Sequence, residues 1–304
     1  MLIFATSDKG GTGRSVTGCN IAYRRALQGE DVAYLDFDFG SPTAGAIFDI
    51  PDAERGVANR GLHSYLRSGL EPVELDIADE SNRESLRDMP PSSGRLVLFP
   101  GDRGGGEFGR SQELIPRCIS LFNRLEQEYA VSVIDLSAGR SYAADLVLAV
   151  TGDERMRRVT SRWLVFHRWT RQHIIAANGL VFGERGILDA GKARGFDSQL
   201  LWDSIRFIRT AVVNIEASQF TTGSPSQEAW SRAYNQDLRE LASRNGLGLS
   251  TLLGEVPLEP LLLWREQIIS DADVAVSKIA NRATVEAFDA IARRLSDDSS
   301  WEGL

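Results

Sequence analysis

Short apolar runs alternate along this chain with longer segments in which apolar residues recur at helical spacing. Most of the short runs are continuously apolar, as expected of parallel strands that are buried on both faces of a sheet. The pattern therefore predicts an α/β fold, with a doubly wound, mostly parallel sheet and helices on both faces. The expected strands are Leu2–Thr6, Val32–Asp36, Arg95–Phe99, Ser132–Asp135, Leu146–Val150, Thr210–Ile215 and Leu252–Glu255. The expected long helices are Ser111–Tyr129, Asp153–Ala177, Ser226–Asn245 and Ser277–Leu295.

The chain contains no internal repeat, and its composition allows one large domain. Of its 304 residues, 42% are hydrophobic, which is enough to bury a full core. We interpret residues 1–304 as a single domain. Asp79–Gly94, which combines charges with Pro and Ser, and the glycine-rich Gly101–Gly109 are predicted to be exposed loops.

A glycine-rich loop, residues 7–15, lies between the first apolar run and a helical segment, Val16–Gln28. Without Cβ atoms at Gly10, Gly11 and Gly13, the backbone can turn sharply and direct successive N–H groups at phosphate oxygens. The N-terminus of the following helix adds the positive end of its dipole. The order of strand, loop and helix predicts a phosphate-binding site, and a glycine-rich turn without a ligand is the less favoured interpretation.

The charged and hydroxyl residues of this loop depart from the ordinary phosphate-loop pattern. Ser15 is placed to offer a hydroxyl to Mg²⁺, but Arg14 stands where that pattern has Lys, and Lys9 lies at the start of the loop. The Lys-Gly-Gly-x-Gly arrangement resembles the deviant Walker-A loop of the ParA/MinD family of P-loop ATPases. That resemblance implies a P-loop NTPase fold, ATP and Mg²⁺ as cofactors, and a homodimer formed with ATP.

The resemblance also implies roles for the loop residues. Lys9 would reach across the dimer to the phosphates of the partner's ATP. Arg14 replaces a second lysine of the family, and a planar guanidinium is bulkier than a compact ammonium. Phosphate binding is compatible with either group, but we expect hydrolysis to be slow with Arg14. The residues expected to bind the nucleotide here are Gly10, Gly11, Thr12, Gly13, Arg14, Ser15 and Val16.

Carboxylates follow two of the expected strands. Asp36 and Asp38 end the second strand, and Asp135 ends the fourth. The Asp-x-Asp-x-Gly segment is similar to the family's switch I, which implies that Asp36 helps to hold the Mg²⁺ shell and that Asp38 orients the attacking water. Asp135 lies where a Walker-B carboxylate holds Mg²⁺. It begins a segment similar to switch II, in which Ser137 and Gly139 are candidate sensors of the γ-phosphate. The alternatives are ordinary loop carboxylates and a strand terminator.

Two later segments extend the resemblance over most of the chain. Asn214 matches the strand-ending asparagine that contacts adenine in the family, and an amide offers both a donor and an acceptor for a base edge. Asparagine is also frequent at strand ends for reasons of turn geometry. Pro257 belongs to a segment that resembles the loop packing the base from the other side. Residues 178–209 have no evident counterpart, so we expect an insertion, a lid or a partner-binding segment there.

The predicted helix spanning Arg155–Arg171 is rich in arginine, with Trp and His residues interleaved. Such a surface suits contact with phosphate backbones or with an acidic partner. The plainer interpretation is a helix with a core face and a solvated arginine face. His63, His167 and His173 form no recognisable ligand set, and lone histidines are usually structural.

The charge and the cysteine content argue against several classes of protein. The formal charge of −8 argues against a protein that coats nucleic acid by overall electrostatics. Cys19 and Cys118 are too few for a disulfide framework or a zinc site, which fits a reducing cytoplasm. No run approaches the length of a membrane span, and no charged leader precedes the first strand. The acidic end, Ser296–Glu302, differs from a membrane-binding basic helix. We predict a cytoplasmic protein that does not bind membranes.

Three classes of function follow from these features. The first is an ATP-dependent dimerisation switch that positions or partitions a cargo, either DNA or a protein assembly, with the help of a stimulating or cargo protein. The second is an ATP-binding adaptor with weak or no hydrolysis, in which Arg14 traps a long-lived state. The third is a P-loop small-molecule synthetase, which requires a substrate pocket that the sequence does not reveal. Metal-cluster carriers on related folds need paired cysteines, which this chain lacks.

Overall fold

The computed structural model describes residues 1–106, 108, 112–213 and 224–302. These residues form an eight-stranded sheet with the order β3-β4-β2-β5-β1-β6-β7-β8. All neighbouring strands are parallel except β3, which pairs antiparallel with β4 at one edge. The predicted α/β fold with a mostly parallel sheet is confirmed. The strands are β1 (Leu2–Thr6), β2 (Val32–Phe37), β3 (Leu75–Asp76), β4 (Leu96–Phe99), β5 (Val131–Leu136), β6 (Ser161–Arg168), β7 (Ile205–Val212) and β8 (Leu252–Pro257).

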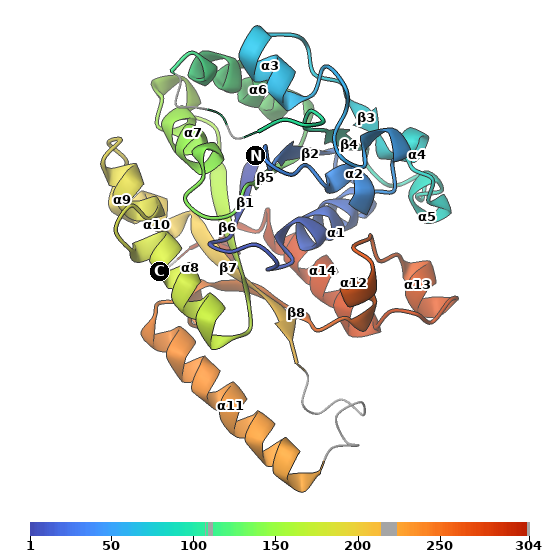
Figure 1. Cartoon of the computed structure of the whole chain (residues 1–304), viewed down its shortest axis with the longest axis vertical. Helices are drawn as coiled ribbons and strands as arrows, with labels where there is room; N and C mark the ends of the chain where they lie inside the picture. Colours follow the sequence, from blue (N-terminus) through green and yellow to red (C-terminus); the bar gives the residue numbers. More distant parts are fainter. Residues whose placement is uncertain (107, 109–111, 214–223, 303–304) are drawn as a thin grey trace.

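Helices cover both faces of this sheet (Figure 1). On one face, α1 (Arg14–Leu27) packs beside α14 (Arg282–Arg294), and both contribute to a core that includes Ile3 and Tyr34. The opposite face carries α6 (Leu114–Glu128), α7 (Tyr142–Thr151) and α8 (Arg171–Phe182) over a core that includes Phe4 and Leu35. Successive residues of each strand thus enter opposite cores, because side chains alternate along a strand.

Shorter helices and one long helix complete the described chain. The stretch Asp79–Gly94, predicted to be an exposed loop, contains the end of α4 and all of α5. The long helix α11 extends away from the sheet at one end of the molecule (Figure 1). These elements are α2 (Ala44–Ile47), α3 (Leu62–Ser68), α4 (Ile77–Glu80), α5 (Glu84–Arg87), α9 (Ile187–Lys192), α10 (Ser198–Asp203), α11 (Pro225–Arg244), α12 (Pro260–Trp264) and α13 (Asp271–Ala275).

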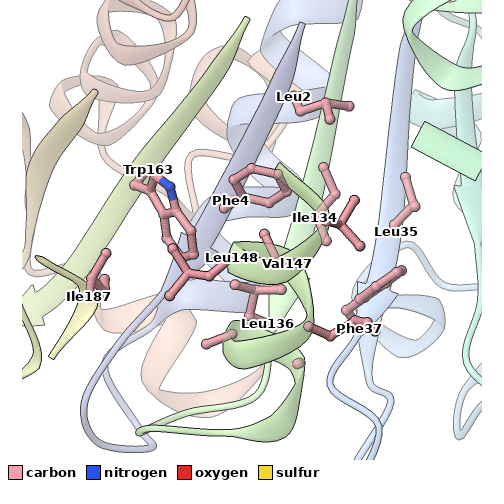
Figure 2. Packing of buried hydrophobic residues seen from close by; sticks show 14 of the residues in the cluster. Leu2, Phe4, Leu35, Phe37, Ile134, Leu136, Val147, Leu148, Trp163 and Ile187 are labelled. Carbon is pink, nitrogen blue, oxygen red and sulfur yellow. The ribbon is translucent and has the colours of Figure 1, made fainter. Parts of the chain in front are cut away.

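The predicted strand Leu146–Val150 is wrong, because these residues belong to helix α7. The side chain of Ser141 caps the helix by accepting a hydrogen bond from the backbone N–H of Ala144. Figure 2 shows Val147 and Leu148 of α7 packed on the sheet face that carries Phe4 and Leu136. A short apolar run is compatible with a buried helix as well as with a strand, so periodicity alone does not separate them.

The predicted arginine-rich helix over Asp153–Ala177 is also wrong. Its middle forms strand β6, which lies between β1 and β7 inside the sheet. Arg155 and Arg157 precede this strand in a turn and form ion pairs with Asp153 and Glu154. The arginines of this stretch are therefore divided between a turn, a buried strand and the start of α8. They do not form one basic helical surface, and nucleic-acid binding through such a helix has no structural basis.

The stretch 178–209 is packed into the fold. It contains the end of α8, then α9 and α10, and it leads into β7. Ile187 of α9 and Leu201 of α10 are buried in the same core as α7. A role in partner binding stays a prediction. Among the described residues, no helix has the length and apolar character needed to span a membrane.

Candidate functional site

The glycine-rich loop connects the end of β1 to the first residue of α1, as predicted. Gly11 and Gly13 adopt φ values of 71° and 76°, and Gly13 is the N-cap of α1. Side chains at these two positions would be strained, because L-residues other than glycine rarely adopt this left-handed conformation. The two glycines thus bring the loop backbone to the amino end of a long helix, where N–H groups lack intrahelical partners.

Two pockets flank this loop at the carboxyl ends of the strands. The first has a volume of about 200 Å³ and is lined by residues 10–16 of the loop and helix together with Asp38 of the β2 end and Ala138 of the β5 end. The second has a volume of about 230 Å³ and shares Gly11, Thr12 and Gly13 of the loop with the first. Its lining includes Thr210 and Ala211 of β7 and Pro257 of β8. Ligands of open α/β sheets bind at this edge.

The loop is tied to the sheet by Thr210. Its buried hydroxyl donates to the backbone oxygen of Thr12 at 2.6 Å. The next residue, Ala211, has a φ of 53°, where β7 and β8 are out of regular register. Strained backbone of this kind persists where the surrounding structure fixes it, often at ligand sites. The second pocket is therefore built from an irregular strand end that holds the loop in place.

Arg14 pairs with two of the three carboxylates of the predicted switch segments, Asp38 and Asp135. Its Nη2 donates to Oδ2 of Asp38 at 3.0 Å, and its Nε donates to Oδ1 of Asp135. Nη2 also lies 3.3 Å from Oγ of Ser15. Burial lowers the pKa of Arg14, but Asp135 and Asp38 outweigh this effect and raise it above the ordinary value. The guanidinium is thus a fixed positive charge among the residues predicted for metal binding and hydrolysis.

Asp135 is also held by a tyrosine from the neighbouring strand. The hydroxyl of Tyr34 donates to Oδ2 of Asp135 at 3.0 Å and lies 3.3 Å from the backbone oxygen of Ser15. Both residues are buried, with exposed fractions of 0% for Tyr34 and 1% for Asp135. Burial raises the pKa of Tyr34, and the nearby Asp135 charge raises it further. The Tyr34 hydroxyl therefore keeps its proton at physiological pH, and Oδ2 of Asp135 is the nearer of its two acceptors.

Asp36 lies directly beside Asp135 in the register of β2 and β5, but its carboxylate has other partners. It accepts hydrogen bonds from the backbone N–H of Ala44 at 2.9 Å and from that of Asp38 at 3.3 Å. Burial, with Asp135 and Asp38 nearby, raises the pKa of Asp36 to about 8. The backbone donors oppose this rise. Asp36 thus anchors the segment that leads from β2 to α2.

The predicted ligands of Mg²⁺ do not fit that ion in this arrangement. The guanidinium of Arg14 contacts Ser15 and Asp135, and the oxygens of Asp36 face backbone donors. Mg²⁺ requires an octahedron of oxygen ligands, and a guanidinium in the same space repels it. In the part of the chain that the structure describes, no group of three or more His, Cys, Asp or Glu side chains is arranged to hold a metal.

The remaining predicted residues are distributed around the two pockets. Lys9 is exposed on the loop and forms no ion pair within the described chain, and Pro257 lines the second pocket. Gly139 donates its backbone N–H to Ser7 of the loop at 2.7 Å, while the Ser137 hydroxyl contacts the β2 end. Asn214 lies outside the described residues.

The sequence pattern gives no sign of several residues of this site, among them Glu266, which lines both pockets. Tyr34 supports Asp135, Thr210 holds the loop, and Arg168 at the end of β6 lines the second pocket. The sequence pattern predicts a helix at Arg168 and therefore does not indicate its position at the carboxyl edge of the sheet. Recognition of the buried run Trp163–Phe166 as a strand would have placed it there.

Comparison with solved structures identifies the fold. The MinC:MinD cell division protein complex of Aquifex aeolicus matches with a TM-score of 0.61 and 15% identity, over 100% of this chain and 96% of that chain. MinD of Pyrococcus horikoshii OT3 complexed with Mg-ADP matches with a TM-score of 0.54 and 15% identity, over 98% and 96%. The pNOB8 ParA bound to nonspecific DNA matches with a TM-score of 0.55 and 15% identity, over 98% and 99%.

The chain has the fold of the MinD and ParA ATPases. The predicted P-loop fold is confirmed over almost the whole chain and over almost the whole length of each of these structures. No protein-family model matches the sequence, and the search of curated proteins finds no match. At 15% identity these matches establish the fold alone, so the ligand and partners of this chain are matters for proposal.

Proposed function

We propose that this chain is an ATP-dependent dimerisation switch of the ParA/MinD type that positions or partitions a cargo. The main support for the proposal is that two pockets share one glycine loop at the carboxyl edge of a MinD-like sheet. The first pocket is lined by residues 10–16, whose backbone suits phosphates. The second, bordered by Ala211 and Pro257, suits a base and sugar.

Nucleotide phosphates would be neutralised by cations from three elements. Arg14 and the amino end of α1 face the first pocket, and Arg168 of β6 lines the second. Lys9 is exposed beside Gly10 and has no acidic partner within the described chain. A lysine in that state is available to the phosphates of a second copy, which would couple ATP binding to dimerisation.

Hydrolysis in this switch would be slow. Asp38, proposed to orient the attacking water, pairs with Arg14 at 3.0 Å. Water orientation by Asp38 therefore requires that this ion pair loosen, which adds to the barrier of the chemical step. The same ion pair supports a second candidate, an ATP-binding adaptor with little or no turnover. ATP turnover measured beside dimer lifetime separates the two candidates, since only the switch releases its partner upon hydrolysis.

The cargo of the switch is proposed by analogy with the matched structures. One of these contains MinC and another contains nonspecific DNA. We propose either a protein partner or DNA as the cargo, bound by the dimer rather than by a basic helix of the single chain. An electrophoretic shift assay with ATP and with ADP, repeated at increasing salt, tests the DNA alternative, because phosphate contacts weaken steeply with salt.

Isothermal titration with ATP and ADP tests the nucleotide site. A Cβ at Gly10 would meet no atom within 4 Å, yet Gly10 lines the first pocket. Gly10→Val should therefore leave folding unchanged, as judged by circular dichroism, and abolish binding by filling the phosphate space. Gly106 is equally open and lines neither pocket, so Gly106→Val is the matched control. Failure of the folded parent protein to bind ATP or ADP at millimolar concentration would refute the proposal.

A further inference from the structure

We propose that the guanidinium of Arg14 serves as the resident cation of the phosphate site, so that this chain binds nucleotide phosphates without a divalent metal. Arg14 pairs with Asp135 through Nε and with Asp38 through Nη2, and Nη2 also contacts Ser15. One side chain thus connects the hydroxyl and two of the carboxylates expected to surround a metal and its attacking water. The inference rests on the proposed nucleotide binding and specifies the chemistry of that site.

The carboxylate oxygens around Arg14 already have donors. Oδ1 of Asp135 faces Arg14, while Oδ2 accepts from the Tyr34 hydroxyl at 3.0 Å. Both oxygens of Asp36 accept from backbone N–H groups, at 2.9 and 3.3 Å. A divalent metal with near-octahedral oxygen ligands would have to displace these donors, and it would lie against a like charge.

Burial fixes the guanidinium in this place. The exposed fractions of the side chains are 6% for Arg14 and 2% for Asp135. Removal of one partner from a buried ion pair leaves an uncompensated charge, which is strongly unfavourable. Arg14 therefore does not leave Asp135 readily to make room for a metal. A lysine ammonium is a single compact charge, whereas the guanidinium fork spans both Asp135 and Asp38.

Arg14 also retains donors for a phosphate. It contributes to the lining of the first pocket, beside Gly10 and Gly13. Its Nε and Nη2 bind carboxylates, and no described residue accepts a hydrogen bond from its Nη1. Guanidinium N–H groups form strong, directed hydrogen bonds with phosphate oxygens. The one side chain thus provides the positive charge and the bridging contact that a metal would otherwise supply between carboxylates and phosphates.

The metal dependence of ATP binding tests this inference. Titration calorimetry of the parent protein should give a Kd in excess EDTA within about twofold of that in Mg²⁺. Arg14→Lys keeps the charge but cannot bridge both carboxylates, so its affinity should fall by about tenfold or more in EDTA and recover with Mg²⁺. Arg24→Gln is the control, because Arg24 lies on the same helix and pairs with Asp271, yet it lines neither pocket. A parent protein that loses about tenfold in EDTA would overturn the inference.

A second measurement uses Mn²⁺ alone, followed by electron paramagnetic resonance in the absence of nucleotide. The parent protein should leave Mn²⁺ free in solution, and Arg14→Gln, which exposes Asp38 and Asp135, should bind it. Equal binding of Mn²⁺ by the two proteins would overturn the inference. If ATP binds neither with nor without metal, the proposed function fails, and the Mn²⁺ comparison still decides whether Arg14 excludes a metal.

Discussion

Thr210 and Thr12 are joined by a buried hydrogen bond in which the Thr210 hydroxyl donates to the backbone oxygen of Thr12 at 2.6 Å. The bond links β7 to the glycine loop across 198 positions of the sequence. Both residues are almost fully buried, with exposed fractions of 4% and 2%. The loop is therefore held by the sheet as well as by its own turns.

Replacement of Thr210 tests this link. Thr210→Val preserves the shape of the side chain but leaves the Thr12 oxygen unsatisfied, which should cost about 1–2 kcal/mol in the free energy of unfolding. The affinity for ATP should fall as well, because the loop loses its tether. Thr210→Ser keeps the hydroxyl and should bind ATP like the parent, although it loses a buried methyl group. Urea unfolding and calorimetry measure both effects, and equal ATP affinities of the Val and Ser variants would contradict the role of the tether.

The local features of the site were predictable from the sequence because neighbouring residues determine them. The strand, glycine loop and helix around Gly13 form as expected, since the glycines leave few other conformations. Asp36 and Asp135 follow apolar runs that form β2 and β5, and the two residues lie beside each other in the sheet. Parallel strands bring such strand ends to one edge, so their proximity follows from the alternation of strands and helices.

The errors arose where distant contacts decide the structure. Strand β6 carries Arg162, whose charge suggested an exposed helix face. The arginine is buried because it donates to the Leu295 carbonyl and to Asp298, more than 130 positions away. The pairing of Arg14 with Asp38 and Asp135 was missed for the same reason. The sequence separation of Arg14 from Asp38 and Asp135 does not indicate that a guanidinium would enter the predicted metal site.

Trp301, near the end of the chain, packs over two buried arginines of the sheet, Arg162 and Arg206. Its ring lies 4.6 Å from the Arg162 guanidinium and 5.3 Å from that of Arg206, and its Nε1 donates to the Arg294 carbonyl at 2.9 Å. Trp301→Ala should lower the free energy of unfolding by about 3–5 kcal/mol. Trp301→Phe keeps a ring and should cost about 1–2 kcal/mol.

Trp264 provides the control for these variants, because its exposed fraction is 89%. Trp264→Ala should change stability by no more than about 0.5 kcal/mol. The three variants are compared by urea unfolding in one buffer. A Trp301→Ala protein as stable as Trp264→Ala would show that the end of the chain does not contribute to the core.

His167 makes stability depend on pH. Burial lowers the pKa of His167 to about 4, while Nδ1 lies 3.2 Å from the Arg168 carbonyl and Nε2 is buried with no hydrogen-bond partner among the described residues. In the unfolded chain the imidazole takes up a proton below about pH 6.5, but in the folded chain only below about pH 4. Its contribution is therefore fully present above pH 6.5 and declines as the pH falls, by on the order of 3 kcal/mol at pH 4.

His167→Gln removes this titration, so the stability at pH 7 minus that at pH 4.5 should be lower in the variant than in the parent. Asp36, whose pKa is raised to about 8, contributes with the opposite sign, but equally in both proteins. His173 is less buried than His167, and burial lowers its pKa to a smaller extent. His173→Gln should therefore retain most of the parent's pH dependence. Urea unfolding at five pH values between 4.5 and 7 measures the slopes. A parent slope that persists in His167→Gln would assign the pH dependence to other groups.

Lys9 should control dimerisation through the partner's nucleotide. It is exposed at the start of the loop and has no ion pair within the described chain, so it does not serve the fold of its own subunit. ATP places negative charge between two positive loops, and loss of the γ-phosphate weakens that link. Sedimentation velocity should therefore show dimer with ATP and monomer with ADP or without nucleotide. Lys9→Ala should stay monomeric with ATP while it keeps most of its ATP affinity, and Lys192→Ala, an exposed lysine outside the loop, should dimerise like the parent. If Lys9→Ala dimerises with ATP as fully as the parent does, Lys9 does not link the two subunits through the partner's nucleotide. This conclusion holds even if the variant still binds ATP.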